Sequence, residues 1–269
     1  MCAVTQHLLL GGERVGTQLY DLGVRRGDIL LVHASMRSAG GDARGMSDAL
    51  RRTLGPEGTL VVPAFTPENS DTSRSYLDRV RGLSDEARAE VRASMPAFDP
   101  ATSPAPGMGA LAEWVRLTPG ALRSTHPQTS FAALGPAAGK LLSGHRQDCH
   151  LGENSPLARL YEADAQVLLL GTGFASCTAF HLAEYRRPAP PRRLYRCVVA
   201  SEGGRRWWEY EDIALDDSDF AALGADFVRA RSEVVAQGQV GAARSHLFPL
   251  RAAVEFAAEW LRERRPDGR

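Results

Sequence analysis

Two short apolar runs on either side of an amphipathic segment constrain the fold more than any other feature. Residues 27–35, GDILLVHAS, and 57–65, EGTLVVPAF, predict buried strands, because aliphatic and β-branched residues follow a turn signal in each. The segment between them predicts a helix from Ser47, a candidate N-cap, to a stop at Gly55. A strand, a helix and a strand in this order predict a parallel pair joined by a right-handed crossover.

The rest of the chain continues this alternation. A third buried strand is predicted at residues 165–173, AQVLLLGTG, with a glycine turn into a helix at 177–185, and residues 194–212 predict a hairpin. Further helices are predicted at 5–22, 108–118, 136–144, 155–164 and 250–265, and a further strand at 126–135. Without an internal repeat or linker, we expect a single α/β domain over residues 1–269. Its central, mainly parallel or mixed sheet would be flanked by helices, with an added antiparallel hairpin.

Residues 67–107 break the alternation. Segments such as TPENSDTS and MPAFDPATSPAPGMG are rich in proline, serine and aspartate. Each proline removes a backbone donor from a sheet, so these segments are not core strands. A long irregular segment in a compact enzyme is often a binding loop, and we expect one here.

Charge and cysteine content narrow the class of protein. The 32 basic and 32 acidic residues cancel, which gives no general reason to expect a nucleic-acid partner. No run approaches the roughly 18 apolar residues of a membrane-spanning helix, and the first residues lack the regions of a secretory signal. The four cysteines are dispersed without a CxxC pair, which suits a reducing compartment. We therefore expect a cytoplasmic protein without a membrane partner.

His181 and Glu184 are the first candidates for chemistry. They are three residues apart in CTAFHLAEY, so on a helix they occupy neighbouring positions of one face. This helix would begin at the carboxyl end of a buried strand, the edge where open α/β sheets bind ligands. A carboxylate can orient a histidine ring and stabilise its protonated form, which suits a general base. A histidine with a purely structural role explains the same pattern.

Other chemistries compete for the same residues. Cys177 and His181, with His145, Cys149 and His150 upstream, match none of the common zinc spacings, so we expect no metal. A Cys177 nucleophile paired with His181 is conceivable, although one helix does not reliably aim a thiol at an imidazole. The VHASMRSAGG loop offers backbone amides to a phosphate or an acyl-carrier arm. It has neither GxxxxGK[ST] nor GxGxxG, so a nucleoside-triphosphate or dinucleotide site is unsupported.

Several segments taken together resemble the aminoglycoside 3-N-acetyltransferase family of antibiotic acetyltransferases. They occur in family order over nearly the whole chain, and between residues 66 and 95 the chain departs from the family pattern. The segments are LLVHASMRSAG, LGPEGTLVVPAF, FDPATSPAPGMGALAEWV, STHPQTSFAALGPAA, GENSPLARLYEADAQVLLLG, SCTAFHLAEY and VGAARSHLF.

The resemblance implies an antibiotic-resistance enzyme that transfers acetyl from acetyl-coenzyme A to the 3-amino group of a 2-deoxystreptamine aminoglycoside. It implies that His181 and Glu184 form the catalytic centre, and we expect direct transfer in a ternary complex. Residues expected to line the coenzyme path are Ser35, Met36, Arg37, Ser38, Ser130 and Phe131, with Arg37 and Arg192 as possible phosphate partners. We expect a monomer or homodimer whose partner is a small cationic amine.

A polycationic acceptor should be held by carboxylates. Candidates in the irregular segment and in the acidic stretch at 209–219 are Glu68, Asp71, Asp212 and Asp216. Two alternatives stay open at this point. The chain could be an acetyltransferase of the same fold that acts on a non-antibiotic amine, such as a biosynthetic amine or a phosphonate nucleotide. It could also be a coenzyme A-binding protein without catalysis, which the presence of both His181 and Glu184 disfavours.

Overall fold

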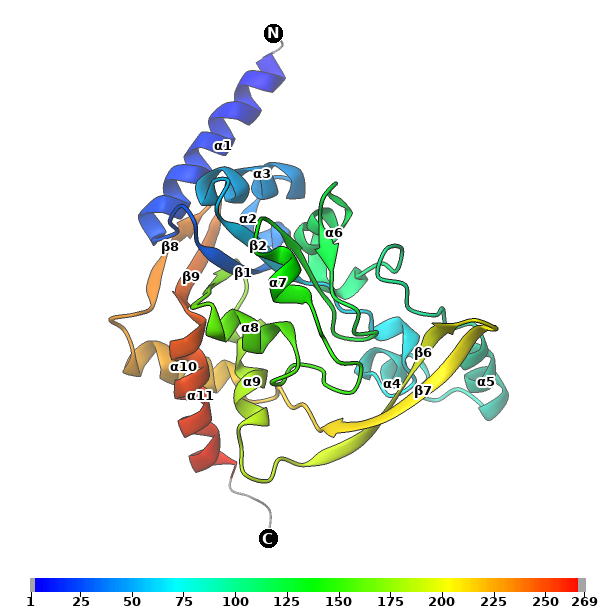
Figure 1. The fold of residues 1–269 in the computed structure, drawn as a ribbon. Helices are drawn as coiled ribbons and strands as arrows, with labels where there is room; N and C mark the ends of the chain where they lie inside the picture. The colour runs from blue at the N-terminus through cyan, green and yellow to red at the C-terminus, as the bar shows by residue number, and fades with distance from the viewer. Residues whose placement is uncertain (1–2, 266–269) are drawn as a thin grey trace.

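The computed structural model describes residues 3–265, with side chains from residue 13 onward, and builds them around a seven-stranded mixed sheet (Figure 1). The order across the sheet is β3-β4-β2-β1-β5-β9-β8. The strands are β1 (Ile29–Ala34), β2 (Thr59–Pro63), β3 (Leu122–Arg123), β4 (Phe131–Leu134), β5 (Gln166–Leu170), β8 (Ala236–Val240) and β9 (Ala243–Pro249). The expected fold class is therefore confirmed.

The three central strands are parallel, as the strand–helix–strand pattern predicts. In the register, β1 pairs with β2 through Leu30 and Leu60, and with β5 through Leu31 and Val167. Strand β4 is antiparallel to β2, and β9 is antiparallel to β5. From β1 the chain passes first to β2 on one side, and only later to β5 on the other side. The sheet therefore has a topological switch point between β1 and β5.

Helices cover both faces of the sheet, because alternate residues of each strand point to opposite sides. Leu30 and Val32 of β1 pack in the core with α1 (Ala3–Leu22), α3 (Ala43–Leu54) and α6 (Gly109–Leu117). Leu31 packs in a second core on the other face. The helices of that core are α7 (Ala138–Leu142), α8 (Pro156–Glu162), α9 (Ala179–Tyr185), α10 (Phe220–Ala230) and α11 (Leu250–Arg264). No helix in the described range is long and apolar enough to cross a membrane.

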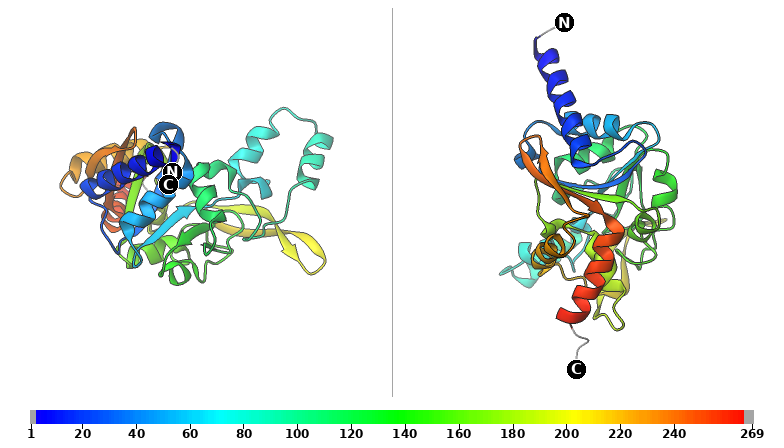
Figure 2. Two further views of the ribbon diagram at one scale, coloured as in Figure 1. Left: turned by 90° about the horizontal axis from the view of Figure 1, so that it is seen from above. Right: turned by 90° about the vertical axis from the view of Figure 1, so that its left-hand side faces the viewer.

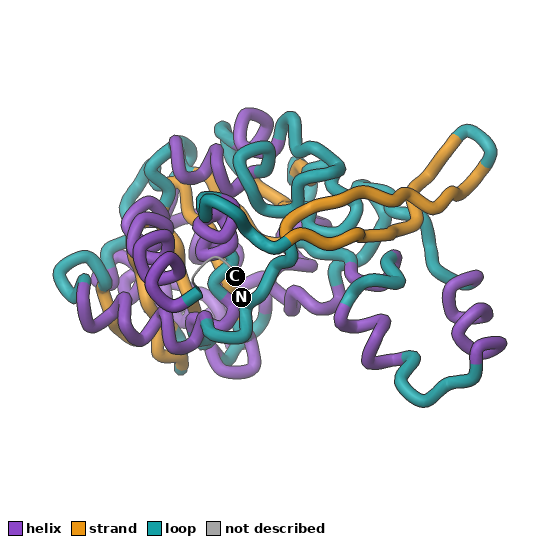
Figure 3. The backbone as a smooth tube through the Cα atoms, turned by 90° about the horizontal axis from the view of Figure 1, so that it is seen from below, coloured by secondary structure: helices purple, strands orange, loops and turns teal. Residues whose placement is uncertain are grey.

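The predicted hairpin forms a separate two-stranded ribbon. Strands β6 (Arg192–Ser201) and β7 (Gly204–Ile213) pair along their whole length and extend away from the sheet, with α4 (Arg74–Arg79) and α5 (Asp85–Ala93) beside them (Figures 2 and 3). A small apolar cluster that includes Tyr76, Met95 and Val198 joins these helices to the ribbon. The expectation of an irregular loop at 67–107 was therefore wrong in part, since this segment holds two short helices.

The structure differs from the sequence-based prediction in the start of α3 and in three elements that were not predicted. Helix α3 begins at Ala43, and its N-cap is Asp42, whose carboxylate accepts a hydrogen bond of 2.8 Å from the Gly45 amide. Ser47 is a buried residue inside the helix and not its cap, because Asp42 already satisfies the first amides. Sequence patterns also missed α10, β8 and β9, whose polar or alanine-rich segments lack a clear period.

Candidate active site at the sheet switch point

The candidate site lies at the carboxyl ends of β1 and β5. Strand β1 runs into α2 (Met36–Ala39), and β5 runs through Gly171 and η3 (Phe174–Ser176) into α9. The Ser35 amide bonds to the Leu170 carbonyl at 2.9 Å, so the two strand exits stay in contact. In a doubly wound sheet, this point leaves a crevice for a ligand.

His181 and Glu184 meet at this point, on α9. Nδ1 of His181 lies 2.6 Å from Oε2 of Glu184, and the side chains are 12% and 3% exposed. A carboxylate only accepts hydrogen bonds, so Nδ1 is the donor in this contact, and in a neutral imidazole Nε2 then carries the lone pair. Nε2 has no hydrogen-bond partner within residues 3–265. The Phe220 ring, at 4.8 Å between centroids, packs against the imidazole and restricts its rotation.

A second histidine, His33, stands beside this pair, and sequence reasoning gave it no role. It is the fifth residue of β1, is 8% exposed, and its Nε2 lies 3.2 Å from Oγ1 of Thr178. Burial, and then the nearby His181, lower its pKa to about 4, so it is neutral at pH 7. Its position near the end of the first parallel strand was the signal that could have identified it.

The predicted coenzyme loop lines a groove at the switch point. Ser35 caps α2 by accepting a hydrogen bond from the Ser38 amide at 3.3 Å. A Cβ on Gly171 would come within 2.8 Å of the Ser38 Cβ, so only glycine lets the loop approach β5. The groove has a volume of about 420 Å³ and is lined by Ser38, Gly171, Thr172, Ala242, Ala243, Arg244 and His246.

The other predicted coenzyme residues differ in their surroundings. Met36 packs partly buried against the core beneath the loop, whereas Arg37 is exposed and has no partner within the described range. Ser130 and Phe131 have no exposed surface; the Ser130 hydroxyl donates to the Ala64 carbonyl at 2.7 Å. Arg192 pairs with a glutamate of the hairpin at 2.5 Å. No contact here supports a coenzyme role for Ser130, Phe131 or Arg192, and that role stays a prediction.

Two of the four predicted acceptor carboxylates are buried against protein partners. Asp71 is 1% exposed at its side chain, and its oxygens face Nε of Arg92 at 2.9 Å and Nε of Arg196 at 3.1 Å. Asp212 is buried and accepts hydrogen bonds from the amide of His150 at 2.8 Å and the hydroxyl of Tyr185 at 2.5 Å. Asp71 therefore joins the loop before α4 to α5 and β6, and Asp212 joins β7 to α9 and to the loop before α8.

The remaining two carboxylates are available to a ligand. Glu68 is half-buried and has no hydrogen bond or ion pair within the described residues. The Asp216 side chain is 51% exposed, although its Oδ1 accepts a hydrogen bond from the Ser218 amide at 3.0 Å and its Oδ2 lies 3.8 Å from Nη2 of Arg265. The Asp216 amide donates to Oε1 of Glu184 at 3.1 Å. Asp216 therefore connects the acidic stretch directly to the His181–Glu184 pair.

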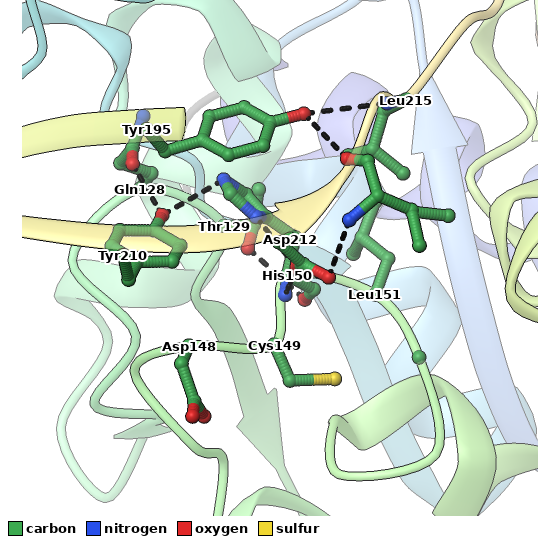
Figure 4. A network of polar contacts seen from close by, with 12 residues as sticks. Gln128, Thr129, Asp148, Cys149, His150, Leu151, Tyr195, Tyr210, Asp212 and Leu215 are labelled. Atoms are coloured by element: carbon green, nitrogen blue, oxygen red, sulfur yellow. Dashed lines mark hydrogen bonds and ion pairs between the residues drawn. The ribbon is translucent and has the colours of Figure 1, made fainter. Parts of the chain in front are cut away.

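A network of buried polar rings supports the site from the hairpin side (Figure 4). His150 lies 3.0 Å from Asp212 through Nδ1 and 3.0 Å from the Tyr210 hydroxyl through Nε2. The His126 ring packs at a tilt against those of His145 and His150, with centroids 4.8 and 4.7 Å away. Burial lowers the pKa of all three histidines, so the cluster is neutral at pH 7.

The three cysteines in the described part of the chain have the properties of packing residues. Cys177 is fully buried, and burial raises the pKa of its thiol to about 12, as it does for Cys197. A thiol that stays protonated is a poor nucleophile and a poor metal ligand. Among the residues that the structure describes, no group of three or more histidine, cysteine or acidic side chains has a metal-binding arrangement.

Comparison with known proteins gives consistent matches. The family model for aminoglycoside 3-N-acetyltransferase matches residues 31–262. The YokD protein of Bacillus subtilis, described as aminoglycoside N(3')-acetyltransferase-like, is 37% identical over 253 residues, which cover 93% of this chain and 91% of YokD. Aminoglycoside N(3)-acetyltransferase VII of Streptomyces paromomycinus is 36% identical over 277 residues, covering 95% and 94% of the two chains.

Solved structures agree with these matches. The crystal structure of YokD superposes with a TM-score of 0.86 at 35% identity and covers 96% of this chain and 95% of YokD. The binary complex of AAC-IIIb with CoASH gives a TM-score of 0.80 at 31% identity, covering 94% and 96%. AAC-VIa bound to sisomicin gives 0.78 at 31% identity, covering 94% and 97%.

These matches place the α/β chain among the acyltransferases. It belongs to the aminoglycoside 3-N-acetyltransferase family, and its cosubstrate is acetyl-coenzyme A. The groove fits such a donor. Arg244 supplies positive charge, and Nδ1 of His246 is a buried polar atom without a hydrogen-bond partner among the described residues.

Proposed function

We propose that this enzyme acetylates the 3-amino group of a 2-deoxystreptamine aminoglycoside, with His181 as general base and Glu184 as its support. The observation that carries the proposal is the 2.6 Å contact between Nδ1 of His181 and Oε2 of Glu184 at the sheet switch point. It holds the ring in the tautomer whose Nε2 accepts a proton. The family match and the sisomicin-bound relative support the choice of acceptor.

The proton has a defined path in this scheme. The acceptor amine attacks the thioester carbonyl, and the carbon–nitrogen bond forms while the carbon–sulfur bond breaks. His181 takes the proton that the attacking nitrogen loses, and the departing thiolate of coenzyme A is then protonated by the imidazolium. A base in this position contributes roughly 10²- to 10⁴-fold to the rate.

Transfer is direct, in a complex that holds both substrates. An acetyl-enzyme would require an activated nucleophile, and the Cys177 thiol, with its pKa near 12, is a poor one. The donor is expected in the groove beside Ser38, Gly171 and Arg244, with Arg37 in reach of its phosphates. The acceptor is expected between His181 and the accessible carboxylates Glu68 and Asp216, on the side where the chain departs from the family pattern.

Steady-state kinetics with acetyl-coenzyme A and a panel of aminoglycosides test the function. We expect turnover, intersecting initial-velocity patterns, and a product acetylated at the 3-amino group in its NMR spectrum. Release of free coenzyme A before an acceptor is added would contradict direct transfer. If only neutral or anionic amines are acetylated, the enzyme acts on another class of acceptor. If coenzyme A binds but no amine is acetylated, the protein is a coenzyme A-binding protein without catalysis.

A further inference from the structure

The end of α11 places a guanidinium behind the His181–Glu184 pair. Arg265 donates from Nη1 to Oε1 of Glu184 at 2.6 Å, and this is the carboxylate oxygen that does not contact His181. The Arg265 side chain is only 15% exposed, and its amide bonds to the Leu261 carbonyl at 2.8 Å. Glu184 is therefore held from both sides, by an imidazole on one oxygen and by a guanidinium on the other.

The same guanidinium binds the loop that follows β7. Nε of Arg265 lies 2.8 Å from Oδ2 of Asp219, Nη2 contacts Oδ1 of the same residue, and Nη2 also donates to the Asp216 carbonyl at 2.7 Å. The planar fork of arginine suits such a bidentate contact. Because the Asp216 amide bonds to Oε1 of Glu184, Arg265 and the loop converge on one carboxylate oxygen.

We propose that Arg265 is a positioning residue for acetyl transfer, which fixes Glu184 against His181 and connects the acceptor-side loop to the same carboxylate. This inference rests on the proposed role of His181 as general base. Arg265 lies outside the 31–262 segment that the family model matches, so the family comparison does not assign it.

The charge of Arg265 also limits how strongly Glu184 attracts a proton to the imidazole. Burial disfavours the charged guanidinium, but hydrogen bonds to Asp219 and Glu184 outweigh it, and the pKa of Arg265 is raised well above its ordinary value. Without that positive charge, the negative charge of Glu184 would attract a proton on His181 more strongly. The other titratable and charged groups around the pair are His33 from β1, His150 from the loop before α8, Tyr195 from β6, Asp216 and Asp219 after β7, and Arg187 after α9.

Arg265→Gln and Arg265→Lys test the proposal, with Arg264→Gln as the matched control. Arg264 is the preceding residue and is 62% exposed; its guanidinium lies 3.7 Å from Asp226 and 5.3 Å from the centroid of the Trp260 ring, and neither belongs to the His181–Glu184 pair. We expect Arg265→Gln to lower kcat about 10- to 100-fold through misplacement of the pair. We also expect the acidic limb of its kcat/KM profile to move to higher pH. Arg265→Lys should keep the limb in place while losing part of kcat, and Arg264→Gln should match the parent enzyme.

The outcomes separate this proposal from the general-base assignment. Binding of coenzyme A by calorimetry and the thermal midpoint verify that each variant is folded. Parent-like kcat and pH profile in folded Arg265→Gln, with an inactive His181→Ala, would overturn the positioning role alone. Full activity in His181→Ala would instead overturn the general-base assignment. A loss of kcat in Arg265→Gln without any movement of the limb would show a purely structural contact and also contradict the proposal.

Discussion

At the scale of single residues, the structure divides the acidic side chains into two groups that look alike in the sequence. Asp71 and Asp212 are buried against arginines or a histidine, so they hold segments together. Glu68 and Asp216 remain open to a ligand. Net charge along the chain could not make this division, because it depends on which partners the fold brings within about 3 Å.

Asp216→Asn should raise the KM for a polycationic acceptor with little change in kcat. Burial opposes ionisation of Asp216, but hydrogen bonds involving Ser218 outweigh it and lower its pKa, so the carboxylate is charged at pH 7. A half-exposed charge is screened, so we expect a rise of roughly 2- to 5-fold that shrinks as salt is added. Steady-state kinetics at two ionic strengths measure this.

Asp71→Asn is the control for that prediction. Its partners Arg92 and Arg196 would lose their common counter-charge, so the free energy of unfolding should fall by about 1–3 kcal/mol. The acceptor KM should change less than in Asp216→Asn. Equal increases of KM in the two variants would show that Asp216 has no special place in the acceptor site.

At the scale of elements, sequence patterns were most successful where a buried strand or a capped helix produces a strong local signal. The parallel strands β1, β2 and β5, the hairpin, and α8 with Ser155 as its cap were all predicted. The α4–α5 pair was missed because proline and serine around it suggest loops, and its packing against β6 is a long-range effect. The His181–Glu184 contact followed from helical spacing, whereas Arg265 comes from 81 residues away and no local pattern could place it there.

The glycine turn at the end of β5 predicts how the Ser35–Ser38 loop responds to a substitution at Gly171. Gly171→Ala would set a Cβ within 2.8 Å of the Ser38 Cβ and 2.9 Å of the Ala243 Cβ, at a φ of +66°. We expect the Ser35–Ser38 loop to shift, at a cost of about 1–3 kcal/mol in stability, and affinity for coenzyme A to weaken. Gly173→Ala is the control, since a Cβ there meets nothing within 4 Å. Calorimetric titration of coenzyme A into both variants measures the difference; unchanged affinity in Gly171→Ala would place the donor elsewhere.

At the scale of the whole molecule, the buried histidines join segments far apart in the chain. His33 connects β1 to α9 through Thr178, and His145 bonds to Ser124 and to carbonyls of the loop before α8. Burial lowers the pKa of both rings, so these contacts are made by neutral histidines at pH 7. Interior packing and the protonation state of the protein are therefore coupled.

This coupling predicts that stability falls as the pH drops from about 6.5 to 4. Burial lowers the pKa of His33 and His145 to about 4 in the folded state, below the ordinary value near 6.5. In that window the unfolded chain binds more protons, so each histidine removes up to about 3 kcal/mol from the free energy of unfolding. Urea unfolding at pH 7 and pH 5 measures the loss, and His145→Gln should reduce it. The same loss in His145→Gln would show that this group does not contribute.

The central claim for the whole enzyme is that His181 removes the proton from the acceptor amine. The most direct measurement is the single-turnover rate of acetyl transfer by His181→Ala, with coenzyme A affinity measured on the same preparation. We expect the rate to fall roughly 10²- to 10⁴-fold while coenzyme affinity stays close to that of the parent enzyme, because the ring acts on the acceptor and not on the donor groove. A variant that transfers acetyl at the parent rate, or that loses coenzyme binding while its chemistry is unchanged, would contradict the account.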